Sequence, residues 1–300
     1  MKKTALCLLL ALLAAAAAVA EGEAVYVQTQ NVIYAEVESV GLLMDVFAPA
    51  QEGGAAKGLG IICVISGAWK SGRGMVEAYQ KTGIIDILCA HGYTVFAVRP
   101  GAYTSFTAEQ MLEHINLGIR YVKSHAAEYA IDAGRLGLTG ASAGGHLACL
   151  AATRSEPATR FAPDTAVQAV AVICPATDFL DFGGEKYGLG LMEWRLAFQG
   201  GAAGRSEQEK EAAAKSISPM YHVKPGLPPF LLIHGDADSL IPTEQSTRFV
   251  AALQAAGNSA DLIIKPGGDH SWPTIKEEIE KLAQWFDAKL VSLPRGRAGL

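Results

Sequence analysis

One short run, residues 136–150, constrains this chain more than any other. It places a serine between an apolar strand pattern and an apolar helix pattern. Gly140, Ser142 and Gly144 form the pattern Gly-x-Ser-x-Gly. A turn this sharp holds the serine in a strained backbone conformation, and only glycine fits two positions to either side. The pattern therefore predicts a nucleophile elbow with a raised, reactive hydroxyl at Ser142.

Strand patterns alternate with helix patterns along the rest of the chain. The first two strands, residues 31–38 and 42–48, are expected to form an antiparallel hairpin that turns near Gly41. The later strands are expected at residues 60–65, 94–98, 136–139, 169–174, 229–233 and 262–264, and the helices at 75–89, 107–125, 243–256 and 274–290. This alternation predicts an α/β fold. Its central sheet is mostly parallel, with an antiparallel N-terminal hairpin and helices on both faces.

The longest break in the alternation runs over residues 179–218, which are rich in glycine and then in alanine and charge. We expect a small cap insertion over the site, and the alternative is a surface excursion that never meets substrate. The folded domain is expected over residues 24–292, with a loose tail at 293–300.

The N-terminal residues 1–20 read as a secretory signal peptide. Lys2 and Lys3 precede an apolar run, and Ala18 and Ala20 supply the small residues of a cleavage site. An uncleaved anchor is the alternative, but the apolar core is short for a membrane span. A secreted or periplasmic location follows, without stable membrane insertion after cleavage.

Charge and cysteine content narrow the function classes further. The net charge of −5 does not indicate the positively charged surface that a nucleic-acid partner would need. The four cysteines of the mature chain lie inside apolar patterns without metal-ligand spacing, so mostly buried free thiols are expected, with one disulfide as the alternative: Cys63, Cys89, Cys149 and Cys174. No metal or cofactor is expected.

A serine nucleophile needs a histidine base and a carboxylate that orients it. In the fold expected here these follow in the order Ser, acid, His. His270 lies after the last predicted strand and is the only histidine downstream of a suitable acid. Asp236 and Asp238 both follow the preceding strand. Asp238 is favoured because it lies further into the loop, and Asp236 is expected to form a turn with its own backbone.

The oxyanion of the reaction intermediate needs backbone donors. The Ala143 amide, directly after the serine at a helix N-terminus, is one candidate. Gly67 or Ala68, in the loop after residues 60–65, is the other, and the alternative for that loop is a plain strand-to-helix turn. Trp69 and Trp272 are candidates for substrate contact, although large aromatics are more often core. His146 is expected to be a packing and hydrogen-bonding residue, and His234 is expected to order the acid loop. Asp178 is expected to form a turn, and contact with substrate is the alternative.

Three segments together resemble the α/β-hydrolase superfamily, in the esterase/lipase branch related to hormone-sensitive lipase and bacterial feruloyl-esterase-like proteins. They are residues 140–148, residues 234–242, and His270 with an aromatic residue close behind it. Residues 129–137 are also similar to that branch, and the resemblance covers about residues 31–290. One departure stands in the oxyanion loop, where the branch usually carries His-Gly-Gly-Gly before an aromatic residue and this chain has Ile-Ser-Gly-Ala before Trp69.

The resemblance implies a serine hydrolase that cleaves carboxylic esters through Ser142, Asp238 and His270 and an acyl-enzyme. With the export signal it favours a small-molecule or saccharide ester as substrate, such as acetyl or feruloyl esters of polysaccharides. A prolyl-oligopeptidase-like serine peptidase is one alternative, but this chain has no room for the usual propeller domain. A non-catalytic binding protein on a hydrolase scaffold is the other, but such proteins typically lose a triad member.

Overall fold

The computed structural model describes residues 25–50, 56–187 and 191–293. The expected signal peptide, residues 1–20, lies outside these ranges, as do residues 294–300 of the expected tail. Among the described residues, no helix combines the length and apolar character that crossing a membrane requires.

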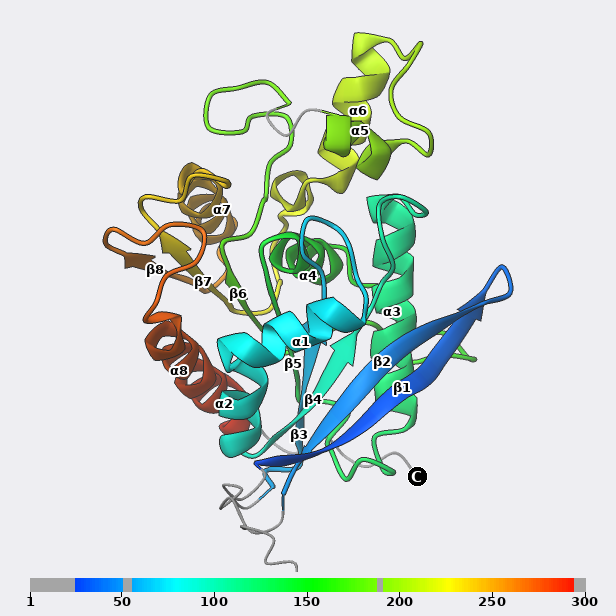
Figure 1. The fold of residues 1–300 in the computed structure, drawn as a ribbon, viewed down its shortest axis with the longest axis vertical. Helices are drawn as coiled ribbons and strands as arrows, with labels where there is room; N and C mark the ends of the chain where they lie inside the picture. The colour runs from blue at the N-terminus through cyan, green and yellow to red at the C-terminus, as the bar shows by residue number, and fades with distance from the viewer. Residues whose placement is uncertain (1–24, 51–55, 188–190, 294–300) are drawn as a thin grey trace, which may run out of the picture.

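An eight-stranded sheet forms the centre of the molecule (Figure 1), in the order β1-β2-β4-β3-β5-β6-β7-β8. The strands are β1 (Tyr26–Val37), β2 (Val40–Pro49), β3 (Leu59–Val64), β4 (Tyr93–Val98), β5 (Leu136–Ala141), β6 (Ala169–Ile173), β7 (Phe230–Gly235) and β8 (Ala260–Lys265). The β1–β2 and β2–β4 pairs are antiparallel, and every pair from β4 to β8 is parallel. The predicted α/β fold with an antiparallel N-terminal hairpin is thus confirmed.

Helices cover both faces of the sheet. One hydrophobic cluster joins the sheet to α3 (Ala108–Ser124), α4 (Ala143–Thr153) and α7 (Glu244–Ala255). A second cluster, on the opposite face, joins it to α1 (Arg73–Thr82), α2 (Ile84–Ala90) and α8 (Ile275–Phe286), which continues into the π-helical turn η2 (Asp287–Val291). Strands β3 and β4 are buried at every position, because side chains from the two faces enter different clusters.

Two local predictions were wrong. The hairpin turns at Glu38 and Ser39, with φ of 49° and 65°, rather than near Gly41. Two consecutive left-handed residues make a tight turn that suits the twist of the flanking strands. The single helix predicted over 75–89 is two helices, because Gly83 adopts φ of 83° and ends α1 before α2 begins.

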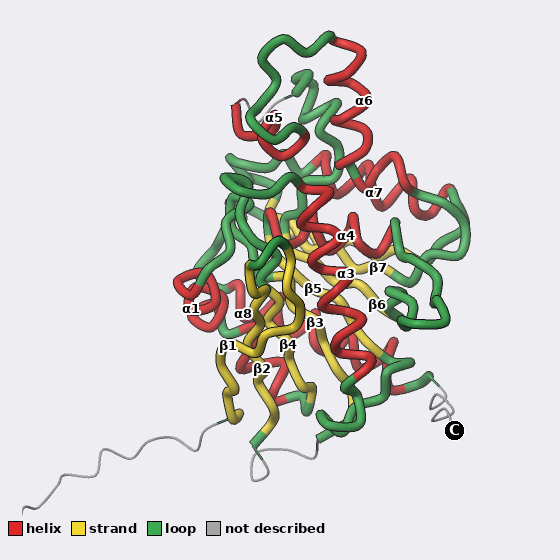
Figure 2. Tube along the Cα trace, turned by 90° about the vertical axis from the view of Figure 1, so that its right-hand side faces the viewer, coloured by secondary structure: helices red, strands yellow, loops and turns green. Residues whose placement is uncertain are grey.

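The insertion between β6 and β7 carries α5 (Leu191–Ala197), α6 (Glu207–Ile217) and the 3-10 turn η1 (Pro219–His222). Two views place α5 and α6 together at one end of the molecule, beyond α4 (Figure 1 and Figure 2). Ser206 begins α6 with a capping box to Glu209. Leu196, Ala214 and Ile217 are buried, so the insertion shares the core cluster of α3 and α4.

The four cysteines within the described ranges are free and buried, as expected: Cys63, Cys89, Cys149 and Cys174.

Candidate active site

The elbow expected at Ser142 is present between β5 and α4. Ser142 adopts φ of 54° and ψ of −121°, a conformation that a non-glycine residue holds only when its surroundings impose it. A Cβ atom at Gly140 would lie 2.5 Å from the carbonyl of Gly144, and one at Gly144 would lie 2.4 Å from the Val64 oxygen. Both glycines are therefore required by the close packing of the turn, and Ser142 stays partly exposed.

Ser142, His270 and Asp238 lie in one hydrogen-bonded row. Nε2 of His270 is 2.9 Å from the Ser142 Oγ, and Nδ1 of the same ring is 2.8 Å from Oδ2 of Asp238. With Nδ1 donating to the carboxylate, Nε2 accepts from the serine hydroxyl. The Asp238 side chain is fully buried and the His270 side chain is 22% exposed, so the imidazole lies between solvent and its acid.

Asp238 is held by several donors at once. Its Oδ1 accepts from the amides of Leu240 and Ile241, each at 2.9 Å, and Nε2 of His234 is 3.2 Å from its Oδ2. Burial alone would raise the pKa of Asp238, but the hydrogen bonds from His234, His270 and the two amides outweigh it and hold the pKa well below its usual range. Asp238 therefore stays ionised beside His270.

The expected role of His234 in ordering the acid loop is confirmed by its contacts. The ring is fully buried, with Nδ1 at 2.7 Å from the Ser246 hydroxyl and Nε2 at 2.9 Å from the Ile241 carbonyl. Because Nε2 faces both that carbonyl and Asp238, the Nε2–H tautomer is the one that fits.

The acid loop and the base loop cross at two glycines. A Cβ atom at Gly235 would lie 2.1 Å from the Gly268 carbonyl oxygen, and the Ala237 amide donates to the same oxygen at 2.9 Å. Asp236 does not form the turn with its own backbone that we expected. Its Oδ1 accepts from the Gly267 amide at 2.6 Å, because the base loop runs alongside. Asp238, rather than Asp236, reaches His270.

The backbone amides of Gly67 and Ala68 differ in their hydrogen bonding. The Gly67 amide already donates to the Lys70 carbonyl at 3.0 Å. Within the described ranges, the amides of Ala68 and Ala143 donate to no protein acceptor, and Ala68 is exposed with φ of 46°. Neither of these two amides is occupied by a protein acceptor, which is what an oxyanion donor requires.

Tyr79 of α1 joins the oxyanion loop to the elbow. Its buried hydroxyl lies 3.2 Å from the Ser66 carbonyl and accepts from the Ala141 amide at 3.1 Å. The Gly144 amide also donates to the Ser66 carbonyl, at 3.2 Å. Sequence reasoning missed Tyr79, because a tyrosine at an inward position of a helix pattern looks like any other core residue.

Trp69 and His146 connect the loop to the insertion. The Trp69 Nε1 donates to Nδ1 of His146 at 2.8 Å, and Nε2 of His146 donates to the Ile217 carbonyl at 2.7 Å. The Trp69 ring also packs on Phe179, with centroids 5.8 Å apart. His146 is a packing and hydrogen-bonding residue, as expected. Trp69 is only 3% exposed, so it anchors the loop instead of forming an open wall.

Trp272 is buried, which argues against the substrate contact expected for it. Its Nε1 donates to Glu278 Oε2 at 2.7 Å, and the ring is buried in the cluster under α8. The expected turn at Asp178 is present, because its Oδ1 accepts from the amides of Leu180 and Asp181, while Oδ2 pairs with Arg248.

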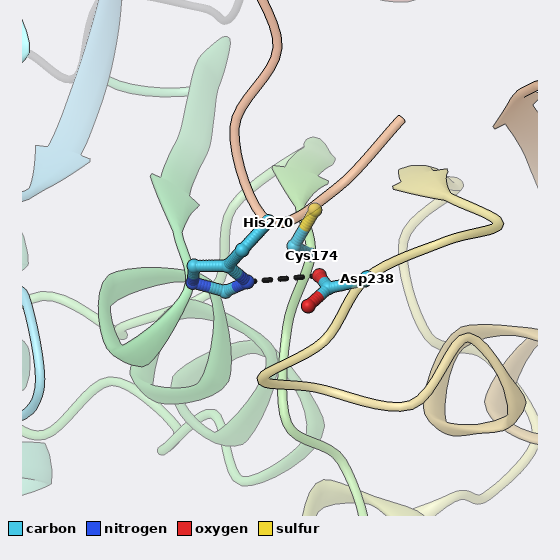
Figure 3. A group of neighbouring side chains, drawn as sticks. All are labelled: Cys174, Asp238 and His270. Carbon is cyan, nitrogen blue, oxygen red and sulfur yellow. Dashed lines mark hydrogen bonds and ion pairs between the residues drawn. The ribbon is translucent and has the colours of Figure 1, made fainter. Parts of the chain in front are cut away.

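A third chemical group lies against the acid and the base. Cys174 follows β6 with φ of 45°, and its thiol lies beside Asp238. One ligand atom each from Cys174, Asp238 and His270 lies within 4.8 Å of the others, and Figure 3 shows the sulfur beside the carboxylate. Among the described residues this is the one group of at least three His, Cys, Asp or Glu residues whose potential ligand atoms lie this close together. The sequence did not reveal that Cys174 lies beside Asp238, because the order of the strands in the sheet decides which residues meet at the strand ends.

Comparisons with known proteins show the family and the fold of this chain. A model of the BD-FAE family matches residues 44–253, a range that includes Ser142 and Asp238 and ends before His270. The probable carboxylic ester hydrolase LipM of Mycobacterium tuberculosis is 31% identical over 199 residues, covering 63% of this chain and 43% of that protein. The chain spans about half the length of such curated relatives, from 43% to 52% for LipM, LipQ and LipC.

Solved structures extend the likeness to nearly the whole chain. A truncated carbohydrate esterase from gut microbiota superposes with a TM-score of 0.74 at 25% identity, covering 90% of this chain and 99% of that one. A propionate-bound thermophilic esterase from Thermogutta terrifontis gives a TM-score of 0.66 at 22% identity, covering 89% of this chain and 96% of that one, and shows the same fold.

Proposed function

Since the chain belongs to the BD-FAE family, in the esterase/lipase branch of the α/β-hydrolases, we propose that it is a serine hydrolase acting on carboxylic esters. The observation that carries the proposal is the hydrogen-bonded row of Ser142, His270 and Asp238, at 2.9 Å and 2.8 Å. Ester hydrolysis is also the activity in the names of the LipM, LipQ and LipC relatives.

Ser142 attacks the ester carbonyl while Nε2 of His270 takes the hydroxyl proton. The same nitrogen then protonates the departing alcohol, which leaves an acyl group on Ser142. Water, deprotonated by His270, hydrolyses that acyl-enzyme and restores the serine. Asp238, kept ionised by its buried donors, fixes the ring tautomer and stabilises the imidazolium that forms in each step.

The amides of Ala143 and Ala68 stabilise the charge that develops on the substrate oxygen. Ala143 begins α4, so the positive end of the helix dipole points the same way. Ala68 is fixed in the left-handed region, so its amide is oriented before substrate arrives. Donors that need no reorganisation contribute most, and removing one typically lowers kcat by about 10²–10³-fold.

The proposed substrates are acetyl or feruloyl esters on polysaccharides, outside the cytoplasm. Three observations support this finer proposal: the signal-peptide pattern of residues 1–20, the family match, and the likeness to a carbohydrate esterase over 90% of the chain. The insertion acts as a cap in this proposal, because Phe179 packs on Trp69, the residue after the Ala68 donor.

The test is covalent labelling combined with a choice of substrates. A fluorophosphonate is expected to label the purified protein, and the label should be absent from Ser142→Ala and retained in the matched control Ser124→Ala, an exposed serine at the end of α3. Turnover of a short-chain p-nitrophenyl ester, without turnover of a peptide amide, is expected alongside. Release of acetate from acetylated xylan, or of ferulate from a feruloylated arabinoxylan, tests the finer proposal.

Each alternative has its own outcome. Amide cleavage at a rate comparable with ester cleavage would indicate a serine peptidase. An unlabelled wild type would overturn the hydrolase proposal and favour a binding protein. Ester turnover without any release from the polysaccharides would retain the hydrolase and reject the polysaccharide substrate.

A further inference from the structure

We propose that Cys174, Asp238 and His270 form a binding site for one thiophilic divalent cation, Zn²⁺ or Cd²⁺, and that its occupation switches the hydrolase off. The cation takes one ligand atom from each residue: sulfur, carboxylate oxygen and imidazole nitrogen. Binding of the cation does not depend on the proposed function, whereas the inhibition rests on the proposed function.

The three ligand atoms come from three different loops that meet at the ends of neighbouring strands. Cys174 follows β6, Asp238 lies after β7, and His270 lies after β8. Their atoms lie within 4.8 Å of one another, and the Nδ1–Oδ2 pair is 2.8 Å apart. Ligand atoms around a tetrahedral zinc ion are about 3.5 Å apart, given bonds of about 2.0–2.3 Å. Adjustments of about 1 Å in the three side chains therefore place three of the four ligands, and a water molecule takes the fourth position.

Burial makes the cluster different from a group of exposed acids. Cys174 is 1% exposed and the Asp238 side chain is fully buried. The His270 ring, 22% exposed, is the side through which a cation enters. His270 and Asp238 already face each other, so the cation takes the place of their shared proton.

The charge balance favours a loaded site. Without a cation the cluster holds a thiol, the Asp238 carboxylate and an imidazole whose Nδ1 faces that carboxylate at 2.8 Å. Binding of M²⁺ releases the thiol proton to solvent and forms the M–S, M–O and M–N bonds. The loaded cluster then carries +2 from the cation and −1 from each of Cys174 and Asp238. It is neutral overall, which suits a buried site.

Inhibition follows from the imidazole tautomer. In the resting row Nδ1 of His270 carries the proton and Nε2 accepts from Ser142. A cation on Nδ1 requires a lone pair there, so the ring proton moves to Nε2. Nε2 then faces the Ser142 hydroxyl as a donor and has no lone pair with which to take the serine proton. The base is therefore lost while the fold stays intact.

The experiment titrates Cd²⁺ into the full-length protein with its thiols reduced. Cadmium–thiolate charge-transfer absorption reports binding, and hydrolysis of a p-nitrophenyl ester is followed in the same samples. The wild type is expected to bind one Cd²⁺ per chain, with loss of activity in step with the absorption and recovery after chelation. Cys174→Ser should lose the absorption and need at least about 10-fold more Cd²⁺ for half inhibition.

Two further variants separate the possible failures. Cys89→Ser, which removes a buried thiol of α2 remote from the site, should behave as the wild type. Ser142→Ala should keep the absorption, because the serine is not a ligand, so binding is measured even if the wild type hydrolyses no ester. Absorption or inhibition that survives in Cys174→Ser overturns the proposal, and so does absorption lost in Cys89→Ser.

Discussion

Acidification should weaken the fold through one buried histidine, His146. The ring is fully buried and carries no charge. Burial lowers its pKa from 6.5 to about 4, a shift that the hydrogen bond to the Ile217 carbonyl only partly opposes. As the pH falls from 6.5 to 4, His146 becomes protonated in the unfolded chain but stays largely neutral in the folded protein. Stability contributed by neutral His146 is therefore full above pH 6.5 and is lost as the pH falls toward 4.

The size of this loss follows from the two pKa values. A difference of 2.5 between 6.5 and 4, at 1.36 kcal/mol for each pKa unit, corresponds to about 3 kcal/mol of unfolding free energy. Protonation would also place a hydrogen on Nδ1, where His146 now accepts from Trp69 at 2.8 Å. Two donors would then face each other beneath the oxyanion loop.

Urea unfolding of wild type and His146→Gln at pH 7 and pH 4 tests the argument. Glutamine keeps a neutral amide in place of the ring and has no proton to gain. Carboxylates titrate in both proteins. The loss of unfolding free energy between pH 7 and pH 4 is therefore compared between wild type and variant, and the difference between the two losses is due to His146. The wild type should lose about 3 kcal/mol more than the variant between the two pH values. Equal losses in the two proteins would refute the reasoning.

Three further predictions concern the site. Asp238→Asn should lower kcat by about 10⁴-fold, because the amide no longer fixes the imidazole tautomer, whereas Asp236→Asn, which keeps the oxygen facing the base loop, should leave ester turnover within a few-fold of wild type. Gly144→Ala should lower the unfolding free energy in urea by about 1–3 kcal/mol and remove most of the labelling by fluorophosphonate, because its Cβ would lie 2.5 Å from the Tyr79 hydroxyl. Gly74→Ala is the control. A Cβ there would have nothing within 4 Å, so this variant should be neutral or slightly stabilising. Tyr79→Phe should cost about 1–3 kcal/mol of unfolding free energy, because an elbow amide loses its buried acceptor.

The order of the chain was enough to find the row of the serine, its base and its acid. Parallel strands end at the same edge of the sheet, so a serine after β5, an acid after β7 and a histidine after β8 converge there. Asp238 was chosen over Asp236 by its depth in the loop, and the structure agrees. The serine, the acid and the base could be found from sequence because each lies directly after a strand with a clear apolar pattern.

The contacts that tertiary packing alone creates were not readable in the sequence. Cys174 meets Asp238 only because β6 and β7 are neighbours, and Tyr79 reaches the elbow from a helix more than sixty positions away, as the separation of 62 residues from Ala141 shows. Trp272 follows the base by two residues, yet its ring turns toward Glu278, because a buried indole N–H needs an acceptor. Adjacency in sequence was a poor guide to these side-chain directions.

The crossing of the base and acid loops at Gly235 and Gly268 bears on when the protein becomes competent during synthesis. The elbow serine and the oxyanion loop have been translated once the ribosome has passed Ala143, roughly half-way along the chain, but their contacts to Ile173 and Phe179 come later. The base is held only after β8 pairs with β7 and α8 packs behind it. A nascent chain therefore carries an inert serine for roughly the second half of its translation. Reactivity requires the last strand and the last helix, β8 and α8.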